Sequence, residues 1–188
     1  MIVGEQEFER ISDMLRKSKN IAIGITICIF IALALIISSG VFGVPANNIE
    51  QDARKNQKID STWEVSKSVN SGLGAMIFYD DTLDDYIYSI YVNRDGFSFG
   101  YFFRSGGANS GIMDGICKLR YDPNGSALIS MNKAGVARID LDNGVNVTRI
   151  DIDPTKPFAV VIPINSGSVT LYDINKNVVP ITVEANEG

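Results

Sequence analysis

The segment from Ile21 to Val44 contains 24 consecutive residues without a charged side chain. A helix rises about 1.5 Å per residue, so a stretch of this length can cross the ~30 Å hydrocarbon core of a bilayer. We therefore predict a transmembrane helix over 21–44, with the lipid bilayer as its partner. The span divides the chain into a head at 1–20, a polar stalk at 45–67 and a C-terminal domain at 68–188.

Basic residues lie mainly at the N-terminal edge of the predicted span. This edge carries Arg16, Lys17 and Lys19, whereas the first basic residue beyond the span is Arg54. By the positive-inside rule, we predict a single-pass protein of the cell membrane with a cytoplasmic N-terminus and an extracytoplasmic C-terminal domain. The apolar residues that recur at helical spacing in the head, and predict a short amphipathic helix there, are Phe8, Ile11 and Leu15.

A secretory signal sequence is the alternative interpretation of the apolar segment. Such signals have an apolar core of about 7–15 residues, followed by small residues at the cleavage site. The core here is longer, although Val44-Pro45-Ala46 places small or medium-sized residues at the required positions. Cleavage after Ala46 would release a secreted domain, but the length of the core favours an uncleaved anchor.

Charge and missing residue types exclude several classes of function. Residues 61–188 contain 15 acidic and 10 basic residues, a net charge of −5, so we expect no nucleic-acid partner and little adsorption to anionic lipid. The chain has no histidine, which excludes Ser-His-Asp and Cys-His catalysis and His-ligated zinc. Cys28 lies in the span and Cys117 in the domain, so no intramolecular disulfide is expected. An exported domain without disulfides is ordinary for bacteria.

From Gly74 onward the apolar residues alternate with a period of two, as in strands. Runs rich in Val, Ile, Tyr and Phe are separated by clusters of Gly, Pro, Asn and Asp. We predict an all-β domain of about nine strands, an antiparallel sandwich or partly closed barrel with a hairpin-rich meander topology. The later strands are expected at 158–162, 169–172 and 178–183.

Three turns that end in Gly predict hairpins with three-residue loops: Asn93-Arg-Asp-Gly96, Asp122-Pro-Asn-Gly125 and Leu141-Asp-Asn-Gly144. In the first hairpin Tyr91 is expected to face Phe99. Tyr121 is expected to face Ala127 in the second, and Leu141 to face Val145 in the third. The apolar parity switches after Val147, so we also predict a β-bulge near Thr148-Arg149.

Ten of the chain's 17 aromatic residues lie between Phe78 and Phe103, which places aromatic residues on both faces of the first hairpin. One face carries Tyr91, Phe99, Tyr101 and Phe103, and the opposite face carries Tyr86, Tyr88 and Phe102. Two aromatic faces indicate either a hairpin buried on both sides or an exposed adhesive surface. If the hairpin is a binding surface, its contact residues for a protein or carbohydrate partner are Tyr86, Tyr88 and Phe102.

Four carboxylates, Asp80, Asp81, Asp84 and Asp85, precede the aromatic hairpin and are candidate ligands for calcium. The run lacks the glycine and the ligand spacing of a defined calcium loop, so a solvated turn is expected and no metal or cofactor is predicted. Ser166, Ser168 and several lysines keep a Ser/Lys hydrolase as an alternative, but no spacing marks a catalytic pair.

Taken together, the span and the missing catalytic groups predict a non-enzymatic, membrane-anchored protein. Its external β domain is expected to bind or scaffold a partner at the cell surface. The alternative is an accessory subunit of a larger membrane complex for transport or secretion, in which the span packs against other helices. A cleaved secreted protein and a hydrolase are less favoured.

Overall fold

The computed structural model describes residues 3–38, 41–94 and 99–186, with the side chains of the first range described at 14 and 16–35. The chain separates into two compact units, Met1–Phe42 and Gly43–Gly188.

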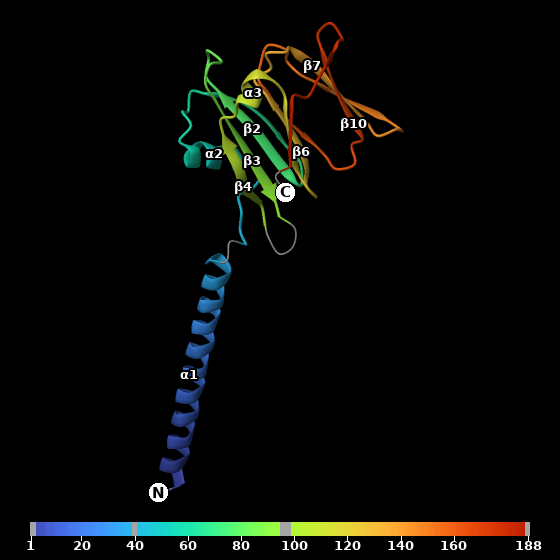
Figure 1. The fold of residues 1–188 in the computed structure, drawn as a ribbon. Helices are drawn as coiled ribbons and strands as arrows, with labels where there is room; N and C mark the ends of the chain where they lie inside the picture. Colours follow the sequence, from blue (N-terminus) through green and yellow to red (C-terminus); the bar gives the residue numbers. More distant parts are fainter. Residues whose placement is uncertain (1–2, 39–40, 95–98, 187–188) are drawn as a thin grey trace. The chain divides into compact units, whose positions relative to one another are not determined.

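The first unit is one continuous helix, α1, from Val3 to Ser38 (Figure 1). The short head helix and the predicted span are therefore not separate elements. Within α1, the segment Arg16–Leu35 is long and apolar enough to cross a membrane, and none of it is buried in the protein. The predicted end of the span at Val44 is wrong, because Val44 belongs to the second unit and pairs with a strand there.

The second unit contains twelve strands in three open sheets, so the described residues form no closed barrel. The first sheet has the order β1-β2-β3-β4, with bounds Glu64–Val69, Leu73–Tyr79, Tyr86–Asn93 and Tyr101–Gly107. The second sheet has the order β12-β5-β6-β9, with bounds Val183–Asn186, Cys117–Tyr121, Gly125–Ser130 and Phe158–Ile162. The third sheet has the order β11-β10-β7-β8, with bounds Val178–Val179, Ser168–Asp173, Val136–Asp142 and Val147–Asp151.

Only the first sheet is a simple meander, and β12 pairs with β5 in parallel, so the predicted purely antiparallel arrangement is wrong at that edge. The strand count exceeds the predicted nine partly because the run at 178–183 divides into β11 and β12. Pro180 lies between these two strands, and proline cannot donate a hydrogen bond to a strand ladder. The two helices of this unit are α2, Ile49–Gln57, and α3, Ser110–Asp114.

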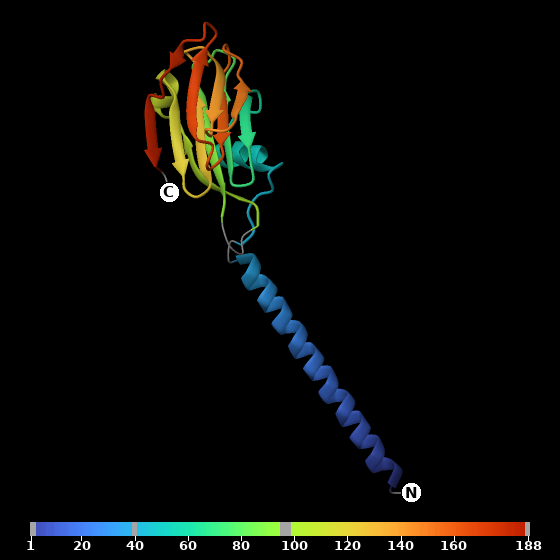
Figure 2. The same cartoon turned by 90° about the vertical axis from the view of Figure 1, so that its right-hand side faces the viewer.

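The three sheets stack face to face, with α2 on the outer face of the first sheet (Figures 1 and 2). One core lies between the first and second sheets, a second between the second and third sheets, and a third between α2 and the first sheet. Strands β2, β6 and β9 are buried at every position because layers cover both of their faces. Their near-continuous apolar sequences are typical of strands buried on both faces.

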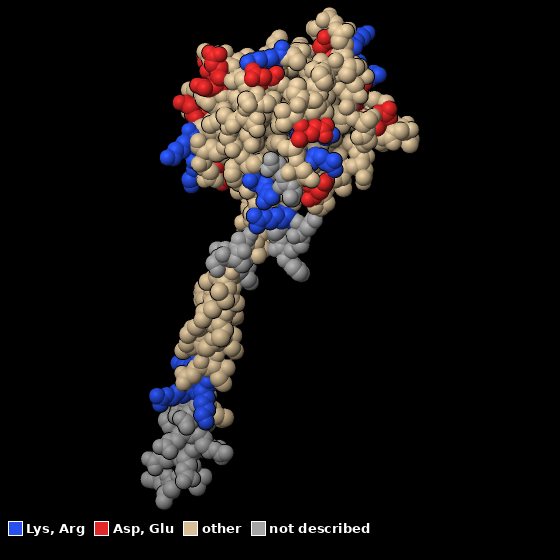
Figure 3. Space-filling model, viewed as in Figure 1, with Lys and Arg blue, Asp and Glu red and all other residues tan. Residues whose placement is uncertain are grey.

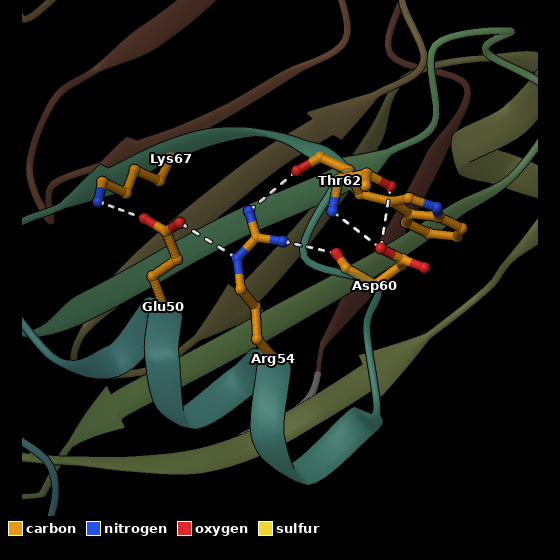
Figure 4. A network of polar contacts seen from close by, with 6 residues as sticks. Glu50, Arg54, Asp60, Thr62 and Lys67 are labelled. Atoms are coloured by element: carbon orange, nitrogen blue, oxygen red, sulfur yellow. Dashed lines mark hydrogen bonds and ion pairs between the residues drawn. The ribbon is translucent and has the colours of Figure 1, made fainter.

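The segment expected to be a polar stalk, 45–67, carries α2 and the start of β1 and contributes to the core. Ile49 and Ala53, one helical turn apart, are buried against the first sheet. Arg54 holds the helix in place by donating hydrogen bonds to the backbone carbonyls of Asp60 and Trp63, at 2.9 and 3.0 Å (Figure 4). The predicted stalk is therefore wrong for this segment. Most residues of α2 are polar and exposed or half-buried, but its two apolar residues lie on one face of the helix and pack against the first sheet.

Hairpin registers differ from the three predicted ones. Tyr91 faces Phe103 because Asn93 pairs with Tyr101, and the predicted turn after Arg94 lies outside the described residues. The ladder then shifts between Ile90 and Tyr91. In the second hairpin Tyr121 faces Gly125, a slip of two residues that keeps every side chain on its predicted face.

In the third hairpin Leu141 faces Thr148 around a four-residue loop, and the ladder runs on without the predicted bulge. The side chain of Asn143 accepts hydrogen bonds from the amides of Val145 and Asn146 and so fixes this loop. Val145 is 85% exposed in the loop, so it does not mark the buried face of β8. The apolar residues therefore change from odd to even positions without an extra residue in the strand.

Candidate functional site

The chain enters the β domain along the edge of β4. The Gly43 amide donates to the Phe99 carbonyl at 2.6 Å, and Val44 and Tyr101 exchange two backbone hydrogen bonds of 2.8 Å. A Cβ atom on Gly100, whose φ is +93°, would lie 2.8 Å from the Val44 carbonyl oxygen. A Cβ atom on Gly43 would lie 2.6 Å from the Tyr101 oxygen. The two glycines therefore permit a close approach that a larger residue would block, and we call Gly43–Val44 the entry segment.

A cleft of about 180 Å³ opens beside the entry segment, between the end of the first sheet and the β5–β6 turn; we call it the end cleft. Its apolar wall is formed by Val92, Phe102 and Tyr121, and its polar rim includes Arg94, Arg104 and Asn124. A second hollow of about 270 Å³ shares Arg94 and Asn124 with it and extends to the β1–β2 turn at Ser71. The volumes suit a small chemical group or one side chain of a larger partner better than a drug-sized ligand.

Two arginines give the end cleft its chemistry. The Arg94 guanidinium carbon lies 4.3 Å from the centroid of the Phe102 ring, and both Arg94 and Arg104 are exposed. Asp122 also lines the cleft, but its carboxylate is 3.4 Å from the Arg120 guanidinium. Guanidinium groups present planar pairs of donors that match carboxylate and phosphate oxygens. The end cleft can therefore hold an anionic group next to an aromatic surface.

The three predicted contact residues do not form one surface. Tyr86 is buried in the core, where its hydroxyl donates to the Asn109 carbonyl and accepts from the Asn109 amide, so its assignment as a contact residue is corrected. Burial also raises the pKa of the Tyr86 phenol. Tyr88 is half-buried and packs against the same core, because this face of β3 points toward the second sheet. Only Phe102 lies in the end cleft.

The opposite aromatic face divides in the same way. Tyr91 and Tyr101 are buried beneath α2, whereas Phe99 and Phe103 are 61% and 47% exposed. Burial on both sides thus explains most of the aromatic residues in this hairpin. The exposed ones gather at the start of β4, beside the entry segment.

The four candidate calcium ligands occupy the β2–β3 turn. Asp80 accepts hydrogen bonds from the Thr82 hydroxyl and from the amides of Asp84 and Asp85, and these bonds, led by that of Thr82, lower the pKa of Asp80. The carboxylate therefore organises the turn that also contains Asp81. Within the described ranges, no three His, Cys, Asp or Glu side chains are placed to hold a metal ion.

The candidate nucleophiles have structural environments. Cys117 is buried in the core between the first and second sheets. The Ser166 hydroxyl donates to the Pro163 carbonyl at 2.8 Å, and Ser168 begins β10. These contacts give no support to a Ser/Lys pair.

No family model, curated protein or solved structure matches the chain. Of the residues that line the end cleft, the sequence pattern singled out Phe102 as a candidate contact residue and did not single out Arg94, Arg104 or Tyr121. Their spacing along the chain carries no motif, and the stacking of two sheets brings them together.

Proposed function

We propose that this chain is a non-enzymatic, single-pass membrane protein whose extracytoplasmic β domain binds or scaffolds a partner at the cell surface. The observation that carries the proposal is the position of the end cleft beside the entry segment. A Cβ atom on Gly43 would lie 2.9 Å from the Phe102 ring, so the chain that comes from the apolar helix runs directly along the wall of the cleft. A partner bound there would be held next to the membrane.

The anchoring and the orientation rest on α1. Its apolar segment, Arg16–Leu35, is long enough to span, and Arg16, Lys17 and Lys19 favour a cytoplasmic position for its N-terminal side. Cleavage after Ala46 would remove the three backbone hydrogen bonds that join the entry segment to Phe99 and Tyr101. Their presence supports an anchor that stays attached to the domain.

The chemistry of the end cleft supports a partner with an anionic or hydroxyl-rich group. Arg94 and Arg104 supply charged donors, and Phe102, whose ring lies under the Arg94 guanidinium, forms part of the apolar wall against which a partner can pack. Proteins and carbohydrates both offer such groups. Binding of one of them, without chemical conversion, is the function that this geometry supports best.

Photo-cross-linking in the native membrane tests the proposal. A photoreactive phenylalanine analogue replaces Phe102 in the full-length chain, and a matched variant carries it at Ile174, which is 71% exposed in the loop after β10. We expect an adduct at position 102 that is absent at position 174. Mass spectrometry identifies the adduct and the mature N-terminus of the same sample. An intact, membrane-bound chain without an adduct at 102 would contradict the proposal.

The same sample distinguishes the alternative of an accessory subunit. In mild detergent, a stoichiometric membrane protein that co-purifies through α1, even when the end cleft is altered, would favour that assignment. A partner that is lost when the cleft is altered supports binding by the β domain.

A further inference from the structure

We infer that the end cleft and the exposed side chains of Phe99 and Phe103 contact the phosphate headgroups of the bilayer that holds α1. The inference rests on the membrane anchoring in the proposed function, and it assigns the end cleft to lipid in place of a protein or carbohydrate. Three independent features of the molecule support it: the length of the connecting chain, the side chains around the entry segment, and the separation of charge within the β domain.

The connecting chain is short. From Lys19 to Ser38, α1 measures about 28 Å at 1.5 Å per residue, close to the ~30 Å thickness of the hydrocarbon core. Four residues separate Ser38 from Gly43, so covalent geometry limits the distance between these two residues to about 18 Å. Because Gly43 is hydrogen-bonded to β4, the start of that strand stays within reach of the headgroup layer.

The side chains around the entry segment suit that layer. Phe99 and Phe103 are exposed apolar rings, which can insert at the boundary between headgroups and acyl chains. Arg94 and Arg104 flank them and present guanidinium donors, which bind phosphate oxygens in pairs. Every phospholipid headgroup carries a phosphate, so the residues match the surface closest to them.

The charges of the first sheet are separated along its strands. The Asp80–Asp85 turn joins β2 to β3 at one end, whereas Arg94 and the start of β4 lie at the opposite end of β3. Figure 3 shows a group of basic side chains at the lower end of the β domain, with acidic side chains next to it and both signs of charge higher on the same face. An anionic surface would attract the arginine end and repel the acidic turn. The distribution of charge, rather than the net charge of −5, therefore decides how this domain meets lipid.

Headgroup quenching in nanodiscs tests the inference with the full-length chain. In a Cys28→Ser background, a fluorophore is attached at Ser71→Cys, beside the end cleft, or at Thr82→Cys, in the acidic turn. The nanodiscs contain phosphatidylcholine and phosphatidylglycerol with a nitroxide on a fraction of the headgroups. We expect several-fold stronger quenching at position 71 than at position 82, and a decrease at position 71 as salt is added. Equal quenching at the two positions would overturn the inference.

A charge-matched pair of variants separates specific contact from simple proximity. Arg94→Gln with Arg104→Gln should reduce the quenching at position 71, whereas Lys133→Gln with Lys176→Gln, which removes the same charge elsewhere, should leave it unchanged. Thermal unfolding shows whether both variants fold, and the salt dependence of the unaltered chain provides the same test if the arginine variant does not. If the quenching at position 71 changes neither in the arginine variant nor when salt is added, the inference is also overturned.

The cross-linking result separates failure of this inference from failure of the proposed function. A protein or carbohydrate adduct at position 102, together with equal quenching at the two labels, would retain the proposed binding site and reject lipid as its partner. A lipid adduct at position 102 would support the inference directly. Equal quenching without any adduct would reject both.

Discussion

The Tyr91 hydroxyl donates a 2.6 Å hydrogen bond to the Asp52 carboxylate and so ties the third strand of the first sheet to α2. The Tyr91 ring is fully buried and meets Phe103 edge to face, with their centroids 5.6 Å apart. One side chain thus links the helix, the sheet and the aromatic residues at the start of β4. The helix is therefore part of the domain that carries the end cleft.

Replacing Tyr91 by Phe removes the hydroxyl and leaves the ring in place. We expect the free energy of unfolding to fall by about 1–2 kcal/mol, because the half-buried Asp52 carboxylate loses a charge-assisted hydrogen bond. Urea unfolding followed by the fluorescence of Trp63 measures this loss. Tyr172→Phe, on the outer face of the third sheet, is the control and should change little. A comparable loss in the control would contradict the importance of the Asp52 bond.

Arg54 makes contacts that a simple positive charge cannot replace. It donates to the Asp60 and Trp63 carbonyls and lies 4.8 Å from the centroid of the Phe78 ring. Arg54→Met should lower the free energy of unfolding by about 1.5–3 kcal/mol. Arg54→Lys should recover little of it, because an ammonium group lacks the planar fork. Lys55→Met on the exposed side of α2 controls for lost charge, and stability in Arg54→Lys equal to the parent chain would contradict this reasoning.

Asn132 connects the second and third sheets through its side chain. Its Oδ1 accepts from the Val136 amide at 2.7 Å, and its Nδ2 lies 3.0–3.2 Å from the carbonyls of Val136, Asp153 and Lys156. Asn132→Asp replaces this donor with an acceptor that faces three carbonyls, in a site where the residue is 5% exposed. We expect a loss of about 2–4 kcal/mol in the free energy of unfolding. Asn165→Asp, at an exposed position that shares the left-handed backbone conformation of Asn132, is the control for thermal unfolding.

Several elements of this fold were predictable because their evidence is local in the sequence. The apolar segment of α1 and the strand at 158–162 follow directly from composition and length, and β9 has those bounds. In the second hairpin the predicted register slipped by two residues, yet Leu119 and Ile129 still lie on the predicted face. Side chains alternate with a period of two, so burial patterns fix the face of a strand more firmly than its partner.

The remaining features depend on contacts between distant segments. The burial of Ile49 and Ala53 was signalled only by their spacing of one helical turn in a short polar helix. A three-residue turn after Asn93 predicted Phe99 as the partner of Tyr91, but Asn93 pairs with Tyr101 and Tyr91 therefore pairs with Phe103. The end cleft combines this hairpin with the β5–β6 turn, and no local pattern specifies how two sheets stack.

The stability of the domain should decrease in alkaline solution through Tyr79. Burial, and then the 3.1 Å hydrogen bond to Glu64, raise the pKa of Tyr79 to about 12. An unfolded tyrosine titrates near pH ~10. Above that pH the unfolded state has released a proton that the folded state retains, so stability present below pH ~10 is lost as pH rises toward ~12.

The loss due to Tyr79 should approach 1.4 kcal/mol per pH unit, or about a tenfold change in the unfolding equilibrium. Urea titrations from pH 8 upward measure it, and Tyr79→Phe should have a shallower decline than the parent chain. Lys156, whose pKa is raised by Glu64, contributes a slope of the same sign and remains in both proteins. Identical pH profiles for Tyr79→Phe and the parent chain would show that Tyr79 does not titrate in this way.

Detachment of the entry segment is the change that connects the fold most directly to the proposed site. Gly100→Ala adds a methyl group 2.8 Å from the Val44 carbonyl oxygen, at a residue whose φ is +93°. Gly144→Ala is the matched control, because Gly144 has a φ of +83° but no atom within 4 Å of the added carbon. Both variants incur backbone strain of about 1 kcal/mol, and only Gly100→Ala also pushes the entry segment away from β4.

Hydrogen exchange distinguishes the two glycine variants. The amides of Gly43 and Val44 donate to β4, so we expect their protection to fall at least tenfold in Gly100→Ala and to stay unchanged in Gly144→Ala. If headgroup contact depends on a short tether, quenching at Ser71→Cys should fall in Gly100→Ala as well, because the released segment lengthens the flexible connection. Unchanged protection of both amides in Gly100→Ala would mean that the close approach of the two backbones is not needed to hold the entry segment.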